Sequence, residues 1–515
     1  INYETGGAMK ISFNLLSQPW IPCIQNDGST VELGLFETLS QAHEFHSLEG
    51  DSPLETASLI RLLLAVLHRV VDTHNQDSWM DVWQTGHFSE KALESYLRQW
   101  ENRFDLFDEE HPFYQQRHDL VDPWAAIKLL PGMSAVPLYY HAVETEESRY
   151  TPAQAARILI TAHTFATPGI RNPQKNLFFN GGPWLSGKVF FLEGNSLFQT
   201  LMLNLLRYAP DHPDPNLCQT DEDAPAWEMD NPFFPERTLP LGYLDYLTWQ
   251  NRRVYLIPVE EEGQIWVKEV VEAPGLKLQG EIRDPMKAYI RDEKKGFKML
   301  YLDKSKALWR QSSAFLDIKS KDRRPPQALL WAADLIEEND LPVSMKLRLM
   351  TVGVVVENNS KIVLHRMERM PLPLQILENT DLALKLRKEV DYAENVKNQL
   401  FFAVNTMAGL LISADSDLPD NRRASNDDIK KLMAHWHWED NYWPPLEFAF
   451  YDLVQDLADN VPEAISIWRK IVQSTAQDSL EDVIHQIDDS AKGLKAAVQA
   501  RSVLFRGLIK LESNG

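Results

Sequence analysis

The residues best suited to chemistry in this sequence lie close together in one stretch, IRNPQKNLFFNGGPWLSGKV (170–189). It carries three basic side chains, four amide side chains, three glycines and two prolines. Arginine, amide side chains and exposed backbone N–H groups bind phosphates and the edges of nucleic-acid bases. The same residue types are common in ordinary surface loops. The stretch is therefore a candidate nucleic-acid contact, and a solvated loop is the competing interpretation.

Part of this stretch, residues 182–188, matches the pattern G-x-x-x-x-G-K of a phosphate-binding loop. The match is incomplete, because Val189 stands where such a loop has Ser or Thr to ligate magnesium. A phosphate-binding loop also opens a helix, whereas KVFFLEG (188–194) is typical of a strand. Pro183 lacks a backbone donor and Trp184 is bulky. A nucleotide-dependent enzyme using Gly182–Lys188 is kept as a disfavoured alternative.

Other reactive residues form no recognisable catalytic constellation. His435 and His437, in HWHW, have a spacing that aligns two imidazoles on a strand, and packing of the neighbouring tryptophans is the favoured interpretation. The stretch FDEEHPFYQQ (107–116) has three carboxylates and a histidine but none of the common hydrolase motifs. Two cysteines, Cys23 and Cys218, are too few for a disulfide framework or a Cys-rich zinc site. We expect no enzyme activity, no metal and no cofactor.

The charge distribution is uneven along the chain. The formal net charge is -22, which argues against a protein that coats DNA nonspecifically. Residues 275–325 nevertheless hold fourteen Lys and Arg against seven Asp and Glu. Such a local excess suggests contact with a polyanion, and a solvated mixed-charge face is the alternative. We expect Lys277, Arg283 and Lys287 to contribute to a positive strip on the surface.

Several elements can be assigned from local patterns. Residues 1–8, which precede Met9, are interpreted as an expression-tag remnant. The run 52–71 predicts a buried helix rather than a membrane span, because Arg61 interrupts it and Ser52 and Glu55 form a capping box. Without a signal peptide or a span, a cytoplasmic location is expected. Asn26-Asp27-Gly28 predicts a hairpin turn.

The texture of the sequence changes near residues 366–375. Before this point short strands such as 253–260 alternate with helices such as 196–208, and the Pro- and Asp-rich segment 209–236 predicts an irregular surface segment. From about residue 376 onward apolar residues recur every three or four positions. We therefore predict an α+β fold, with a mixed α/β domain over 9–365 and a helical bundle over 366–515.

Six stretches together resemble the CasA family, the large subunit of the type I-E CRISPR surveillance complex (Cascade). Each stretch alone is weakly specific, and it is their order over nearly the whole chain from Met9 that carries the resemblance. They are FNLLSQPWIPCIQNDGSTVELGLFETL, HPFYQQ, PGMSAVPLYYH, TPGIRNPQKN with NGGP, NSLFQTLMLNLL and NYWPPLEFAF.

The resemblance implies a large α/β domain of unusual topology followed by a four-helix bundle. It also implies a non-catalytic subunit that recognises the protospacer-adjacent motif (PAM) in duplex DNA, starts strand separation for R-loop formation and helps recruit a helicase–nuclease. Sibling Cascade subunits and the 5′ end of the guide RNA would be its other partners. The alternative is the large subunit of a divergent effector with altered PAM reading.

The family's glycine loop, which faces the PAM minor groove, falls on residues 169–173. Only Gly169 is retained there, so Arg171, Asn172 and the nearby Lys175 are the implied DNA contacts. Arginine in a narrow minor groove is well motivated physically. The family's lysine finger falls on Lys277, with Lys268 as the rival position.

The family's strand-separating wedge, a hairpin tip carrying Gln, falls on residues 357–361. This chain has no Gln there, so Asn358 or Asn359 would substitute, flanked by Ser360 and Lys361. The RNA-anchoring loop falls on Tyr139, Tyr140 and His141, whose rings could stack on splayed bases. Some relatives carry paired C-x-x-C zinc ligands, which this chain lacks.

Overall fold

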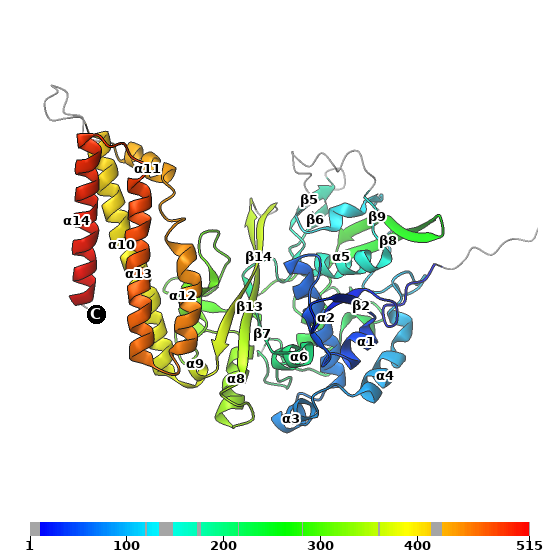
Figure 1. Cartoon of the computed structure of the whole chain (residues 1–515). Helices are drawn as coiled ribbons and strands as arrows, with labels where there is room; N and C mark the ends of the chain where they lie inside the picture. Colours follow the sequence, from blue (N-terminus) through cyan, green and yellow to red (C-terminus); the bar gives the residue numbers. More distant parts are fainter. Residues whose placement is uncertain are drawn as a thin grey trace, which may run out of the picture. The chain divides into compact units, whose positions relative to one another are not determined.

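The computed structural model describes residues 11–118, 121–132, 148–172, 177–214, 216–280, 282–358, 361–413 and 425–513. The chain divides into two compact units. The first unit comprises residues 1–306 and 318–369, and the second comprises residues 307–317 and 370–515. Helices and small sheets make up the first unit, while long helices dominate the second (Figure 1). The predicted α+β fold class is confirmed.

A three-stranded sheet opens the first unit, in the order β2-β1-β3. The turn between β1 and β2 contains Asp27 and Gly28, as the sequence predicts: the φ angle of Gly28 is +85°, and the Ser29 N–H donates to the Asp27 carboxylate at 2.9 Å. Such a positive φ is accessible to glycine at little cost. The elements are β1 (Ile21–Gln25), β2 (Thr30–Leu33), α1 (Leu35–Ser40) and β3 (Phe45–Leu48).

Helix α2 (Pro53–Val70) is the buried helix predicted from the apolar run. The backbone N–H of Glu55 donates to Ser52 Oγ at 3.2 Å, which caps the first turn. Inside the core, Arg61 Nε donates to the carbonyl oxygen of Leu247 at 2.7 Å, so the charged group is hydrogen-bonded where it is buried. Helices α3 (Gln76–Thr85) and α4 (Glu90–Gln99) follow.

Among the described residues, no helix is both long and apolar enough to cross a membrane.

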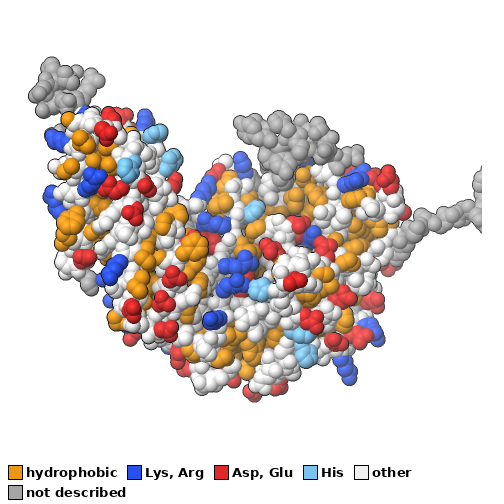
Figure 2. Space-filling view, viewed as in Figure 1, with side chains coloured by type: hydrophobic (Ala, Val, Ile, Leu, Met, Phe, Trp, Pro, Cys, Tyr) orange, Lys and Arg blue, Asp and Glu red, His pale blue; other side chains and the backbone are white. Residues whose placement is uncertain are grey.

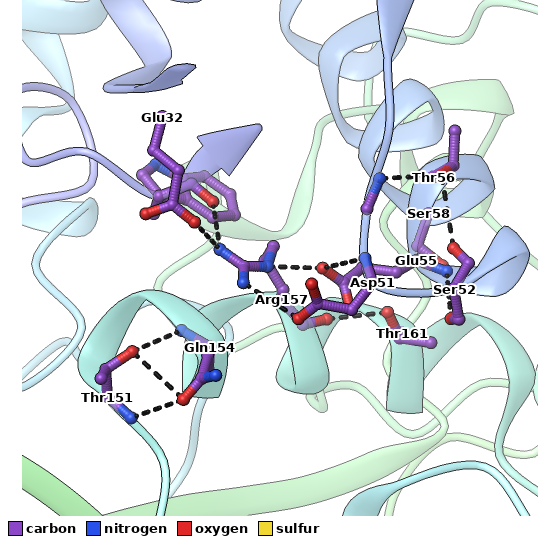
Figure 3. A network of polar contacts seen from close by, with 12 residues as sticks. Glu32, Asp51, Ser52, Glu55, Thr56, Ser58, Thr151, Gln154, Arg157 and Thr161 are labelled. Atoms are coloured by element: carbon purple, nitrogen blue, oxygen red, sulfur yellow. Dashed lines mark hydrogen bonds and ion pairs between the residues drawn. The ribbon is translucent and has the colours of Figure 1, made fainter. Parts of the chain in front are cut away.

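Helix α5 (Pro152–Phe165) is tied to α2 and β2 by one buried arginine (Figure 3). Arg157 contacts Glu32 at 2.7 Å, Asp51 at 3.1 Å and Glu55 at 2.5 Å, and it also donates to the Trp20 carbonyl oxygen at 2.9 Å. Burial raises the pKa of Glu55, and the positive charge of Arg157 opposes that rise. The guanidinium thus joins three chain segments that are distant in sequence.

The central sheet of the first unit has the order β14-β13-β7. Strands β7 and β13 are antiparallel, with Lys188 opposite Gly353 and Glu193 opposite Arg348. Strands β13 and β14 are neighbours joined by three residues, a connection that only antiparallel strands allow. Helices α6 and α8 pack against β7. The elements are β7 (Lys188–Glu193), α6 (Leu197–Asn204), α8 (Gln327–Glu337), β13 (Lys346–Glu357) and β14 (Lys361–Pro373).

Three smaller sheets complete the first unit, in the orders β4-β9-β8, β5-β6 and β11-β10-β12. The long hairpin β8–β9 packs against α5, and β6 packs against β9. Their bounds, with those of α7, are β4 (Trp124–Ala125), β5 (Gly169–Asn172), β6 (Leu177–Phe179), α7 (Tyr243–Leu247), β8 (Arg252–Glu261), β9 (Gln264–Pro274), β10 (Tyr289–Asp292), β11 (Gly296–Met299) and β12 (Arg323–Arg324).

The second unit is built around the 33-residue helix α10, which packs on α11, α13 and α14. A short segment from the middle of the chain completes its core, because Trp309 of the 3₁₀ helix Leu308–Ala314 lies against Trp443, Phe450 and Trp468 at ring-centroid distances of 5.8, 4.9 and 5.9 Å. The helices are α9 (Gln375–Glu378), α10 (Thr380–Ile412), α11 (Asn426–His435), α12 (Trp443–Asp456), α13 (Val461–Ile484) and α14 (Ala491–Ser513).

Candidate nucleic-acid interface

Two hairpins of the first unit border one hollow. Gly169, on β5, and Asn358, at the β13–β14 connection, both line a cavity of about 500 Å³. Figure 1 shows the β5–β6 hairpin beside the tip of β13 and β14. We call this cavity the hairpin groove. Its lining includes Pro168, Gly169, Phe178, Tyr301, Val356 and Asn358. Sequence reasoning gave Gly169 and Asn358 related roles, and the fold brings these positions together.

The β5–β6 hairpin is held at both ends by Arg252, the first residue of β8. This fully buried guanidinium donates to the carbonyl oxygen of Thr167, just before β5, at 2.8 Å, and to that of Asn180, just after β6, at 2.5 Å. Glu272 accepts a third bond at 2.9 Å, and the Phe179 ring lies 4.8 Å away. The planar fork of arginine suits such a multiple contact. One side chain therefore fixes the separation of the two legs.

Glycine is favoured at one position in this hairpin and at one position just after it. The φ angle of Gly169 is +147°, a conformation that other residues rarely adopt. At Gly182, a Cβ atom would lie 2.3 Å from the carbonyl oxygen of Thr164, and the Gly182 N–H donates to Ala166 O at 2.8 Å. The chain after β6 is thus pressed against the end of α5.

The two aromatic residues of β6 face opposite ways, as alternation along a strand requires. Phe179 is 1% exposed beneath Arg252, whereas Phe178 is 58% exposed. In the antiparallel register Phe178 lies opposite Ile170. Phe178 consequently turns away from the Arg252 side of the hairpin and lines the groove.

The β13–β14 hairpin presents an amide and two ionic side chains at its tip. Asn358 adopts a φ angle of +51°, which Asn tolerates better than most residues. Its neighbour Glu357 pairs with Lys304, and this hydrogen bond lowers the pKa of the Glu357 carboxyl. Lys361 opens β14 with an exposed side chain. Asn359 and Ser360 lie outside the described residues.

Other predicted contact residues are placed only in part. The backbone of Arg171 and Asn172 belongs to β5, but their side chains lie outside the described part of the structure. Lys175 and the loop 139–141, with Tyr139, Tyr140 and His141, also lie outside it.

The two candidate lysine fingers differ in their surroundings. Lys277 is exposed between the buried Leu276 and the partly buried Leu278, and within the described ranges it forms no ion pair. Lys268 lies on β9 and donates to Glu261 at 2.7 Å. Neither lysine lines the hairpin groove.

The phosphate-binding-loop interpretation of residues 182–188 has no geometric support. Lys188 opens strand β7 rather than a helix, and its side chain is buried with Nζ 3.7 Å from Glu368 Oε2. Backbone donors of this segment already bond to the protein: Trp184 N–H to Thr164 O at 3.0 Å, and Lys188 N–H to Leu300 O at 2.8 Å. Burial lowers the Lys188 pKa to about 8. No cradle of free N–H groups is formed by these residues.

The basic stretch 275–325 is only partly a surface feature. Lys294 and Lys295 are exposed at the β10–β11 turn. Lys287, however, is buried, with Nζ 2.8 Å from Pro183 O and 3.6 Å from Asp284, so the expectation that it contributes to a surface strip is wrong. Figure 2 shows Lys and Arg side chains gathered over the region of the first unit that carries β13 and β14.

The HWHW segment behaves as a packing element. Trp436 and Trp438 are 3% and 6% exposed, whereas His435 and His437 are exposed. This confirms the packing interpretation. In the ranges that the structure describes, no group of three His, Cys, Asp or Glu residues could hold a metal ion.

Comparisons with known proteins agree with one another. A model of the family "CRISPR-associated protein Cse1" matches residues 14–479. The CRISPR-associated protein CasA/Cse1 of Thermus thermophilus is 30% identical, covering 97% of this chain and 98% of that protein. A crystal structure of Thermus thermophilus CasA superposes with a TM-score of 0.78 at 28% identity, over 97% of this chain and 100% of that chain.

More distant structures share the fold. Cse1 from Acidimicrobium ferrooxidans has a TM-score of 0.81 at 22% identity and covers 98% of this chain and 99% of its own. A chain of a solved CRISPR RNA-guided surveillance complex has a TM-score of 0.72 at 19% identity, covering 96% of this chain and 99% of that chain.

Proposed function

Because the chain belongs to the family of CRISPR-associated protein Cse1, we propose that it is the large subunit of an RNA-guided surveillance complex and reads the PAM in double-stranded DNA. In this role it begins the strand separation that leads to an R-loop and helps to recruit the helicase–nuclease. Its partners are the sibling subunits, the guide RNA and the target duplex. The chain itself carries out no bond-breaking step.

The hairpin groove is the observation that supports this proposal best. Recognition next to strand separation requires that the reading loop and the wedge act on adjacent base pairs, and Gly169 and Asn358 line the same cavity. In our proposal Arg171, Asn172 and Lys175 contact the minor groove, and Asn358 or Asn359 enters the duplex beside them, with Ser360 and Lys361 at its flank. Arginine and amide side chains suit minor-groove recognition.

The charge pattern favours weak, short-lived binding to DNA that lacks the motif. An anionic body limits nonspecific binding, while a few exposed cations supply the phosphate contacts that hold a motif in register. We assign this role to Lys277, Lys294 and Lys295, which are exposed. The loop 139–141 is proposed to anchor the 5′ end of the guide RNA through Tyr139, Tyr140 and His141.

The test is a motif-library screen with the assembled complex. The chain, its sibling subunits and guide RNA are combined and offered duplexes that share one protospacer but carry randomised flanking bases. We expect a small set of flanking motifs to be enriched, and Arg171→Ala to relax the preference. Equal capture of all flanking sequences would overturn the proposal, as would enrichment that survives Arg171→Ala, Asn172→Ala and Asn358→Ala in one chain.

Salt dependence tests the phosphate contacts separately. When one lysine–phosphate contact is removed, the slope of log affinity against log salt concentration should decrease in magnitude by about one. Lys294→Gln and Lys295→Gln should therefore weaken binding to all motifs equally. The matched control is Lys91→Gln, an exposed lysine on α4. An unchanged slope in the double variant would remove these residues from the interface.

A further inference from the structure

Two exposed aromatic side chains line the hairpin groove, and neither was singled out by its sequence pattern. Phe178 is 58% exposed and Tyr301 is 54% exposed. Single exposed aromatics are unremarkable in soluble proteins. These two come from segments more than a hundred residues apart, yet they border the same cavity as the candidate reading loop and the candidate wedge.

Both rings are held in exposed positions by buried neighbours. Phe178 precedes Phe179, whose ring is buried under Arg252. Tyr301 stands between Leu300 and Leu302, each only 7% exposed. The Leu300 N–H donates to Ala288 O at 2.8 Å. The backbone on either side thus sets the direction in which each side chain leaves the chain, which keeps both rings on the solvent side.

We propose that Phe178 and Tyr301 form a stacking surface for the bases that become unpaired next to the PAM. This inference rests on the proposed function. It gives these two lining residues of the groove a role in stabilising the DNA after its strands have separated. Flat rings stack on any base, because every base has a π-face. An amide at Asn358 and a cation at Lys361 stand at the same hairpin tip, and this combination of ring, amide and cation is the chemistry that binds single-stranded nucleic acid.

The stacking surface also explains how Asn358, which is shorter than the Gln of the family's wedge, could keep the DNA strands apart. Asparagine reaches less far into a duplex than glutamine does, so Asn358 alone would displace a base less effectively. Bases stacked on Phe178 and Tyr301 would be held in the open state after displacement. Loss of one such stack costs about tenfold in affinity.

The test compares variants that keep or remove the flat ring in the fully assembled complex. Phe178→Leu and Tyr301→Leu retain apolar bulk and lose the ring, while Phe178→Tyr and Tyr301→Phe retain it. Phe234→Leu is a further control, because Phe234 is 77% exposed and lies outside the groove lining. For duplexes carrying the preferred motif, each leucine variant should bind about tenfold more weakly, whereas the three controls should match the wild type.

Photocrosslinking identifies the bases directly. 5-Iododeoxyuridine placed at successive positions beside the motif should crosslink to Phe178 or Tyr301 at the first unpaired positions only, and peptide mapping would locate the adduct. If the wild-type complex prefers the motif but the leucine variants bind as tightly and no such adduct forms, the stacking inference is overturned while the proposed function stands.

Two other outcomes also contradict the inference. If the wild-type complex shows no motif preference, the proposed function fails and the inference fails with it. If the leucine variants prevent assembly of the complex rather than weakening DNA binding, the groove is a docking site for a sibling protein. Melting temperatures of the full-length variants, which alter exposed side chains, should equal that of the wild type in every case.

Discussion

The two hairpins that border the groove are supported in different ways. The β5–β6 hairpin has strands of only four and three residues and is fixed at both ends by the buried Arg252. The β13–β14 hairpin has strands of twelve and thirteen residues, and its support is the ladder of the sheet β14-β13-β7. In the proposed function, the first hairpin has to keep its register on the DNA, whereas the second has to extend into the duplex. The first hairpin is therefore sensitive to single buried side chains, and the second distributes its support over many backbone bonds.

The largest effect should follow removal of the clamp. Arg252→Met leaves Glu272 buried without its positive partner, which should cost about 3–5 kcal/mol of unfolding free energy. Denaturant unfolding of the full chain would measure this. Arg252→Met with Glu272→Leu should recover much of the loss, since no buried charge remains unpaired. An unchanged midpoint for Arg252→Met would show that the short hairpin does not depend on this residue.

A methyl group at the foot of the same hairpin should have the next largest effect. Gly182→Ala would place Cβ 2.3 Å from Thr164 O, and relieving that overlap should cost about 1–3 kcal/mol. The matched control is Gly409→Ala in α10, where Cβ would lie 3.7 Å from the Ile429 side chain. A helical alanine there should stabilise by up to about 1 kcal/mol. Equal effects at the two glycines would contradict the close approach at Gly182.

The buried Lys188, in the sheet that supports the long hairpin, should make the unfolding free energy depend on pH. Lys188, on β7, faces Glu368 of β14 across the sheet, and burial lowers its pKa from 10.5 to about 8. Between these values the unfolded chain binds more protons than the folded chain, so the Lys188 contribution to the unfolding free energy rises with pH. Any stability advantage of Lys188→Met should therefore shrink between pH 8 and 10.5, by at most about 1.4 kcal/mol per pH unit.

Unfolding free energies of the wild type and Lys188→Met, measured at several pH values across this window, would check the sign. The difference between the two proteins isolates this group from the other side chains that titrate there. A difference that stays constant with pH would show that Lys188 remains charged in the fold.

The smallest effect on stability should come from the exposed tip. Asn358 has a φ angle of +51°, so Asn358→Ala should cost about 1 kcal/mol and Asn358→Gly close to nothing. Both variants lose the amide, and both should reduce strand opening equally, as measured by permanganate reactivity of thymines beside the motif. If Asn358→Ala reduced strand opening more than Asn358→Gly did, in parallel with its larger loss of stability, the tip would act through its backbone shape.

Local patterns predicted the elements of this fold better than their contacts. The capped helix α2, the turn at Gly28 and the strand β7 follow from residue types within a few positions of one another, and all are present. The clamp could not be predicted, because Arg252 reaches Thr167 and Asn180, which lie 85 and 72 positions away in sequence.

Burial was the property that the sequence conveyed least well. Segment 209–236 is irregular, as its prolines and aspartates predict, but Leu217 and Trp227 within it are buried. Lys287 looked like a surface cation and is instead enclosed near Asp284. Composition reports whether a segment forms regular structure, whereas burial depends on which distant segments cover it. Alternation within β6 separates Phe178 from Phe179, yet only the fold decides which of the two is exposed.

The central claim is that the groove between these hairpins makes the affinity of the complex for duplex DNA depend on the motif. The most direct measurement compares the affinity for a duplex carrying the preferred motif with that for the same duplex with a scrambled motif, using complexes assembled with and without this chain. The account predicts a large ratio of the two affinities when the chain is present and a ratio near one when it is omitted. Equal discrimination by the two assemblies would contradict it.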